Sequence, residues 1–395
     1  MHVLMLLAAL STSAEVTIDP SSLSEPPSQV EVALFAGNTR VKSFSTSTTF
    51  TLEPGAYRVT TGGHQLGRFK VNDAVSDVTS ALTSSLGFDL GKLTKVNVDA
   101  SPLASGAKLL VRVDDAIELT KPVTVFVPHG DFRVGAYGSF TVGADGVKSK
   151  SLVVTPRGIT FDTSKYTRVD FAVGDLSSGG AKQVFTVKDV VRFEDDATVF
   201  FADDSYELSR LGRFTTRKGK VSVTGALEWD EGTHALRVDK KLLDRVSLDF
   251  TAFQRGMGSA EPLVLLDAQS TAPSARLIGS GAAYLPRGTY IVSAGEGGGP
   301  LGTFATSPVA STSGGVSWTI TADPTLLVSL KLSSKREFHV APFMRSRSTW
   351  QLSLPKGRYV LTAADGRTLT ELAVDPPRAT LNSGDSGVSL VVAAP

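Results

Sequence analysis

The sequence predicts an all-β fold, built as a tandem array of five small antiparallel β-sandwich domains, and three recurring patterns predict it. The first is a Pro-X-Gly-X-Tyr-X-Val turn and strand. The second is a Leu-Gly-X-Phe segment, eight to fourteen residues after the aromatic residue of the first pattern. The third is an aspartate followed by alternating apolar residues. Because the three patterns keep one order along the chain, they indicate repeated units of one kind.

The turn pattern occurs in TLEPGAYRV, FVPHGDFRV, YLPRGTYIV and SLPKGRYVL, and FADDSYELS is a degenerate copy in the remaining gap. Its aromatic positions are Tyr57, Phe132, Tyr206, Tyr290 and Tyr359. Proline fixes φ and glycine tolerates positive φ, so both suit a turn. Side chains alternate along a strand, so Tyr57 and Val59 are expected on one face. The Leu-Gly-X-Phe segment is expected to return as the next strand, with Phe69 filling the core beside Tyr57.

The aspartate pattern marks where units begin. DLGKLTKV and DKKLLDRV each predict one helical turn capped by its aspartate. Asp19 with Leu23 is expected to start the first unit, and the later units start at Asp89, Asp162, Asp239 and Asp323. These positions predict β-sandwich domains at residues 15–88, 89–161, 162–238, 239–322 and 323–395. Six or seven short strands are expected in each domain. Linkers of about zero to four residues predict beads on a string with limited bending.

The N-terminal residues 1–14 are interpreted as a signal peptide. Val3 to Leu10 is an apolar run too short to span a membrane, and Thr12 and Ala14 suit cleavage before Glu15. The first residues offer His2 where lysine or arginine is expected, so a buried first strand is the alternative. Export places the protein in the periplasm, at the cell surface or outside the cell.

Composition excludes several classes of function. The chain has no cysteine, which excludes disulfides and Cys-ligated metal sites, and an exported chain of this kind suits a bacterium. Forty basic residues balance 39 acidic ones, so nucleic acid is not an expected partner. No later segment is long and apolar enough for a transmembrane span.

The sequence predicts no enzyme, no catalytic residue, no cofactor and no metal site. GEGGGPLG, at residues 295–302, lacks the Lys-Ser/Thr of a phosphate loop and is expected to be a hairpin tip. No nucleophile motif has partner residues in context. The histidines lack the spacing of a metal pair and are interpreted as scattered surface or turn residues: His2, His64, His129, His234 and His339.

The densest acidic stretch is FEDDATVFFADDSY, with Glu194, Asp195, Asp196, Asp203 and Asp204. Two acidic turns could share a calcium ion, which takes six to eight oxygen ligands. A strand of about seven residues separates the turns by roughly 23 Å. This separation favours solvated turns over a calcium site.

The last predicted domain contains a basic and aromatic stretch, KREFHVAPFMRSRSTW. In a hairpin, Arg345 and Arg347 share one face, where they would meet phosphate, uronic acid or lipid A groups. The residues of this candidate anion or polysaccharide contact are Lys335, Arg336, Arg345, Arg347 and Trp350. The alternative is a solvated strand face that covers aromatic core positions.

The segments LPRGTYIV and SLPKGRYVL resemble a bacterial group: carboxypeptidase-regulatory-like, PEGA and Cna B-type domains. The resemblance covers the turn motif strongly in four of the five units. It implies an immunoglobulin-like or transthyretin-like sandwich, and mostly non-catalytic modules of surface, periplasmic or adhesive proteins. Cna B-type domains can carry a Lys–Asn isopeptide bond, but GVSWTI and GVSLVV contain no asparagine, so none is expected here.

We therefore expect a non-enzymatic structural or adhesive protein of a bacterial envelope, appendage or extracellular assembly. Its expected partners are further copies of itself, other envelope or appendage proteins, or surface polysaccharide. Two alternatives are a carbohydrate-binding accessory protein, which would use an exposed tryptophan, and a periplasmic assembly factor.

Overall fold

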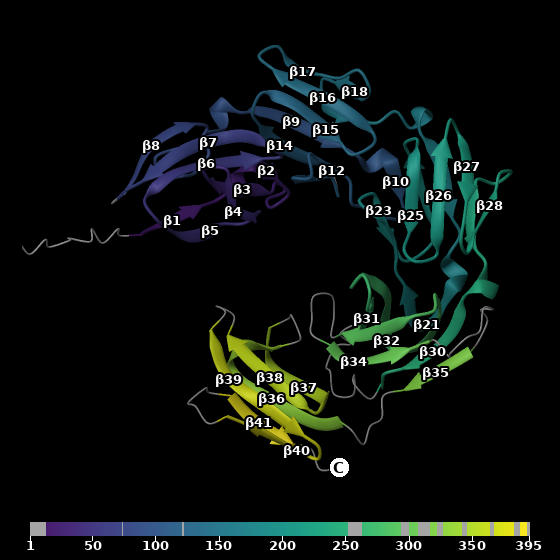
Figure 1. Cartoon of the computed structure of the whole chain (residues 1–395). Coiled ribbons are helices and arrows are strands. Elements are labelled where there is room, and N and C mark those ends of the chain that lie inside the picture. The colour runs from purple at the N-terminus through teal and green to yellow at the C-terminus, as the bar shows by residue number, and fades with distance from the viewer. Residues whose placement is uncertain are drawn as a thin grey trace, which may run out of the picture.

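The computed structural model describes residues 13–72, 74–120, 122–251, 263–293, 300–306, 317–321, 327–341, 346–363, 367–382 and 388–392. The elements with described bounds are β-strands and six 3-10 helices of three residues each. They form small, mostly antiparallel sheets, which confirms the predicted all-β array of sandwiches. We use the names unit 1 to unit 5 for the five predicted domains. In Figure 1 the chain follows an open arc from unit 1, in purple, to unit 5, in yellow.

Unit 1 contains a two-stranded and a five-stranded sheet. The smaller sheet pairs β1 (Ala14–Ile18) with β5 (Thr48–Leu52). The larger sheet has the order β4 (Thr39–Phe44), β3 (Val32–Ala36), β6 (Gly55–Thr61), β7 (His64–Val71) and β8 (Val75–Ser80).

Unit 2 repeats this plan, but its first sheet includes a strand from unit 1. That sheet has the order β18 (Val153–Thr155), β19 (Gly158–Thr160), β9 (Thr94–Asp99), β14 (Val123–Val127) and β2 (Ser24–Glu25). The second sheet has the order β13 (Ile117–Glu118), β12 (Arg112–Val113), β15 (Gly130–Val134), β16 (Gly138–Gly143) and β17 (Gly146–Lys148).

Unit 3 likewise includes strands from unit 2. One sheet has the order β10 (Ala104–Ser105), β24 (Ala197–Phe201), β20 (Thr167–Phe171), β29 (Ala235–Val238) and β28 (Leu227–Asp230). The other has the order β11 (Lys108–Leu109), β23 (Val191–Phe193), β22 (Phe185–Val187), β25 (Asp204–Leu208), β26 (Gly212–Arg217) and β27 (Lys220–Val223).

Units 4 and 5 each have one sheet with a branch. In unit 4 the order is β34 (Pro300–Ala305), β33 (Thr289–Ser293), β31 (Leu263–Asp267), β32 (Pro273–Leu285), β30 (Asp244–Asp249) and β35 (Ser317–Thr321), and β21 (Ser177–Gln183) of unit 3 pairs with β32. In unit 5 the order is β37 (Arg347–Pro355), β36 (Leu327–Val340), β38 (Gly357–Ala363), β39 (Thr368–Asp375) and β40 (Arg378–Leu381), and β41 (Val388–Val392) pairs with β36.

In units 1 to 4 the aromatic pair of the hairpin forms as the repeat predicts, and in unit 5 Tyr359 lies opposite Leu372. Tyr57 lies opposite Phe69 across the β6–β7 pair, and their rings stack with centroids 5.4 Å apart. The same stacking joins Phe132 to Phe140 at 5.2 Å, and it recurs in units 3 and 4. The Tyr57 hydroxyl also donates to the Glu53 carbonyl at 2.7 Å. This hydrogen bond satisfies the polar end of a ring whose body is buried.

The aspartates that start units 2, 3 and 4 cap short helical turns, which confirms the prediction for Asp89 and Asp239 and adds a third case at Asp162. Asp89 accepts a hydrogen bond from Gly91 N at the start of η2 (Leu90–Lys92). Asp162 and Asp239 do the same at η4 (Thr163–Lys165) and η6 (Lys240–Leu242). Asp323 lies outside the described residues.

The expectation that Asp19 starts unit 1 is wrong. The first strand, β1, precedes Asp19, as β9 precedes Asp99. Asp19 and Asp99 accept hydrogen bonds from Ser21 N and Ser101 N at 2.9 and 3.0 Å, ahead of η1 (Ser21–Leu23) and η3 (Ser101–Leu103). Both kinds of aspartate precede a leucine by four residues, so sequence spacing alone did not separate them.

In units 1 to 3 the glycine of the second pattern is required by close approach, whereas in unit 4 a Cβ atom at Gly302 would meet no described atom within 4 Å. At Gly138, where φ is +137°, a Cβ atom would lie 2.6 Å from the Cβ of Ser151. Ser151 is held there because its hydroxyl accepts from Ser139 N at 3.0 Å. We expect Gly138→Ala to lower the free energy of unfolding by about 1–3 kcal/mol, measured by urea denaturation. Gly143→Ala is the matched control, because a Cβ atom at this other end of β16 would meet no described atom within 4 Å. This substitution should change the free energy of unfolding little. Equal effects would contradict this explanation.

Buried tyrosines predict a loss of stability at alkaline pH. Burial raises the pKa of Tyr359 to about 12, and it also raises the pKa of Tyr57 and Tyr206. An unfolded tyrosine ionises near pH 10, so this contribution to stability is complete below pH 10 and falls as the pH rises towards about 12. We expect the urea midpoint to fall over this range. The fall should be smaller in Tyr359→Phe, and an identical fall in both proteins would exclude Tyr359 as a contributor.

Candidate functional site

The predicted basic patch of unit 5 lies partly at the surface. Lys335 and Arg336 are exposed on β36, whereas Arg345 lies outside the described residues. Arg347 is half-buried, and its guanidinium carbon lies 5.1 Å from the centre of the Trp350 ring. The structure therefore brings Arg347 and Trp350 together and places Lys335 and Arg336 in solvent. Contact of these basic groups with an anion stays a prediction.

Trp350 is a core residue, which corrects the expectation of a surface contact at this position. Its side chain is 1% exposed, and its Nε1 donates to the Phe338 carbonyl at 2.9 Å. Trp350 lies opposite Leu332 on the face of the β36–β37 pair that points into the core. A ring buried in this way has no open face on which a sugar could stack.

The burial of Trp350 predicts a large effect on stability. We expect Trp350→Ala to lower the free energy of unfolding of unit 5 by about 3–5 kcal/mol, because a large buried ring is removed. Lys335→Ala and Arg336→Ala should change it by less than about 0.5 kcal/mol. Hydrogen exchange of the unit 5 amides measures the loss of stability in each of these three variants. Unchanged exchange in Trp350→Ala, together with lost retention on an anionic polysaccharide column, would instead support a binding role for Trp350.

The carboxylates of the acidic stretch hold local structure and one contact between units. Asp196 accepts hydrogen bonds from Val173 N and Gly174 N, both at 2.7 Å. Glu194 pairs at 3.1 Å with Arg276, which belongs to β32 of unit 4. Within the described part of the chain, no group of three or more His, Cys, Asp or Glu side chains could hold a metal ion.

The junctions between units carry the most distinctive geometry of the molecule. After its first strand, each of units 1, 2 and 3 sends a short segment into the next unit, where it adds a strand to a sheet. β2 of unit 1 pairs with β14 of unit 2, β10 of unit 2 with β24 of unit 3, and β21 of unit 3 with β32 of unit 4. We call these segments donated strands and call β14, β24 and β32 acceptor strands. The units are therefore joined by shared sheets as well as by short linkers.

Each donated strand is preceded by a short helical turn that ends in a buried leucine. Leu23, Leu103 and Leu176 are 0%, 0% and 1% exposed. Leu23 ends η1, Leu103 ends η3, and Leu176 ends η5 (Gly174–Leu176). The leucine stabilises the junction by burying its side chain, and the following small residue begins the backbone pairing.

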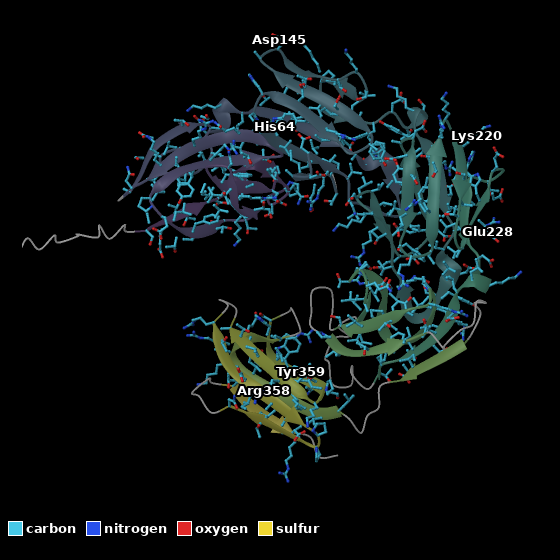
Figure 2. The ribbon with its side chains drawn as sticks, in the orientation of Figure 1. His64, Asp145, Lys220, Glu228, Arg358 and Tyr359 are labelled. Carbon is cyan, nitrogen blue, oxygen red and sulfur yellow. The ribbon has the colours of Figure 1, made fainter. Side chains whose placement is uncertain are left out.

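A second contact at each junction comes from the turn after the aromatic hairpin strand or, at the first junction, from the residue directly after that turn. At the first junction His64 Nε2 lies 3.1 Å from Asp114 Oδ2, and the His64 ring lies 4.2 Å from that of Phe132. Figure 2 shows His64 where the ribbons of units 1 and 2 meet. The histidine therefore combines a polar contact and a ring contact across one junction.

The other two junctions use different chemistry at the corresponding turn. Tyr137 of unit 2 donates to the Phe200 carbonyl of unit 3 at 3.0 Å, and burial raises the pKa of Tyr137 well above its ordinary value. Arg210 of unit 3 pairs with Asp267 of unit 4 at 3.1 Å. The same region of the hairpin thus makes a histidine, a tyrosine and an arginine contact at the three successive junctions.

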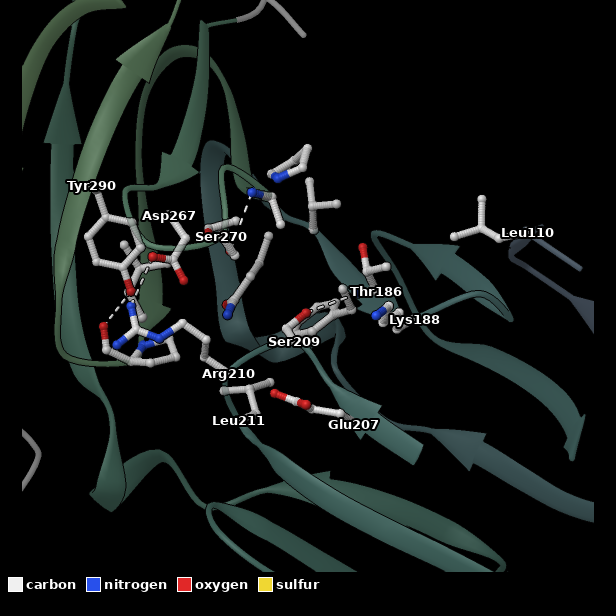
Figure 3. Close-up of a pocket in the computed structure, with 18 of the residues that line it drawn as sticks. Leu110, Thr186, Lys188, Glu207, Ser209, Arg210, Leu211, Asp267, Ser270 and Tyr290 are labelled. Atoms are coloured by element: carbon white, nitrogen blue, oxygen red, sulfur yellow. Dashed lines mark hydrogen bonds and ion pairs between the residues drawn. The ribbon is translucent and has the colours of Figure 1, made fainter. Parts of the chain in front are cut away.

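A cavity of about 540 Å³ lies between units 3 and 4, beside the Arg210–Asp267 pair (Figure 3). Its lining includes Gln183, Phe185 and Tyr290. The Asp267 Oδ2 and Gln183 Oε1 atoms are buried and accept no hydrogen bond from the described residues. Two such acceptors suit bound water or another hydrogen-bond donor. The cavity is therefore a mostly apolar pocket at a junction, with two buried hydrogen-bond acceptors in its wall.

Sequence reasoning missed the donated strands and the junction contacts, although a signal exists. Leu23-Ser24, Leu103-Ala104 and Leu176-Ser177 each place a small residue after a leucine, shortly after an alternating apolar strand.

No protein-family model matches the chain, and no curated protein matches it. Several solved structures show weak likeness, and three of them are described here. The Bacillus anthracis TIE protein is 11% identical over 79% of this chain and 65% of that chain, with a TM-score of 0.14. A streptococcal ancillary pilin is 11% identical over 55% of this chain and 96% of that chain, with a TM-score of 0.15. BcpA, the major pilin subunit of Bacillus cereus, is 8% identical over 78% of this chain and 99% of that chain, with a TM-score of 0.12. No helix in the described residues is long and apolar enough to cross a membrane.

Proposed function

We propose that the chain is a non-enzymatic, exported structural or adhesive protein of a bacterial envelope, appendage or extracellular assembly. The observation that carries this proposal is the donation of a strand from each of units 1, 2 and 3 to the unit after it. Separating two units must then break sheet hydrogen bonds as well as side-chain contacts. A chain joined in this way is suited to hold its partners at a fixed separation.

The partners that fit this function are further copies of the chain or other envelope and appendage proteins. Sheets with exposed edge strands can pair with strands of neighbouring molecules. The near balance of 40 basic and 39 acidic residues gives no strong net field, so association would depend on local surfaces.

Small-angle scattering with light scattering tests the structural part of this proposal, on the chain from Glu15 onward. A compact globule of this length has a radius of gyration near about 21 Å. We expect a clearly larger value, because the units follow an open arc (Figure 1). Fractionation of the source cells tests the location, and we expect the protein with the envelope or in the medium. A value near 21 Å, or recovery in the cytoplasm, would contradict the corresponding part.

A further inference from the structure

The acceptor strands of units 2, 3 and 4 receive their donated strands in one register. Val125, Val199 and Ala283 each lie seven residues before the hairpin aromatic residue of their unit. Opposite them lie the first residues of the donated strands, in the pairs Ser24–Val125, Ala104–Val199 and Ser177–Ala283. On its other edge, each acceptor strand pairs with the first strand of its own unit. The acceptor strand is thus enclosed on both edges.

Unit 1 has the same acceptor strand, with one edge open. Phe50 of β5 lies seven residues before Tyr57 and pairs with Val16 of β1, as Val125 pairs with Val96 in unit 2. Within the described residues, no strand pairs with the other edge of β5. β4 is also a terminal strand of its sheet, whereas its counterpart in unit 3, β23, receives β11 of unit 2. Unit 1 therefore repeats the receiving side of the junction.

The side chain of Phe50 is less buried than its counterparts in units 2 to 4, as expected where no strand covers this edge of β5. Phe50 is 8% exposed, whereas Val125, Val199 and Ala283 are each 0% exposed. The sequence of β5, TTFTL, contains neither a charged residue nor proline, which are the usual devices that protect an open edge from pairing. The open edge of β5 is therefore accessible to an added strand, and no charged residue or proline of β5 opposes the pairing.

We propose that the open edge of β5 receives an extended segment of a different protein, in the manner of the three filled junctions. The donated strands define the chemistry of this segment: a leucine that becomes buried, then a small residue, then a polar residue. A second copy is not the favoured donor. The donated strands of units 1 to 3 are already paired within the chain, and in unit 5 the corresponding segment is replaced by the single strand β36. In unit 4 the sequence that follows β30, residues 250–262, contains no leucine. This inference holds wherever in the cell the protein lies.

The chain supplies its own probe for this edge. A synthetic peptide of residues 99–109, DASPLASGAKL, contains the leucine and both strands that unit 2 donates to unit 3. Hydrogen exchange of the full chain is measured with this peptide and with a control peptide that carries aspartate at the position of Leu103. We expect saturating peptide to slow exchange of β5 amides by tenfold or more, with the β14 amides unchanged and no effect of the control peptide.

Three results would overturn the inference. In the first, neither peptide slows exchange in β5 at millimolar concentration. In the second, both peptides slow it equally, which excludes recognition of the leucine. In the third, the protein dimerises without peptide and its β5 amides are then protected, which assigns the edge to a second copy. None of these results bears on the export or the structural role proposed above.

Discussion

Arg210→Ala is expected to lower the free energy of unfolding by about 3–5 kcal/mol, because it leaves a buried carboxylate without its cation. The Arg210 guanidinium lies 3.1 Å from Asp267 Oδ1, and the Asp267 side chain is 3% exposed. Arg210 also donates to the Arg287 carbonyl of unit 4 at 2.8 Å, so the same change removes a second contact across the junction. Urea denaturation, followed by hydrogen exchange in β25 and β31, measures the loss.

The double variant Arg210→Ala with Asp267→Asn is the matched control for this effect. It removes the charge that the first change leaves buried, so we expect it to recover a large part of the lost stability. A surface pair such as Lys148–Asp145 provides a reference, because both side chains are exposed and Lys148→Ala should cost less than about 1 kcal/mol. If Arg210→Ala also costs less than this, the junction does not depend on the Arg210–Asp267 pair.

Leu103→Ala is expected to destabilise two units at once, by about 2–5 kcal/mol. Leu103 is fully buried, and the next residue, Ala104, begins the strand that pairs with β24 of unit 3. Losing the leucine should therefore speed exchange of β24 amides as well as those of β9. Val154→Ala in unit 2, at a side chain that is 41% exposed, is the control and should change stability by less than about 0.5 kcal/mol. Faster exchange confined to unit 2 would show that the donated strand does not depend on Leu103.

Features that repeat with a fixed spacing could be predicted from the sequence. The pairing of Tyr57 with Phe69 follows from alternation along two strands joined by a turn, and capping by Asp89 follows from the preference of aspartate for that position. Both depend on neighbours close in sequence. This is why the class of fold and the local elements were accessible without the structure.

The donated strands were not predictable in the same way. β2 and β10 are two residues long, which is too short for any periodic pattern, and their partners lie about 90–100 residues further along the chain. Trp350 was misplaced for a related reason. Its stretch alternates basic and aromatic residues, and sequence alone does not tell which face of that strand is covered.

The three junction contacts at His64, Tyr137 and Arg210 have a consequence for how such a chain can change over time. His64 begins β7 directly after a hairpin turn, and Tyr137 and Arg210 lie in the corresponding turns of units 2 and 3. A substitution at one of these residues changes the contacts of one junction and leaves the contacts at the other two in place. The strength of each junction can therefore change separately from that of the others, by single substitutions.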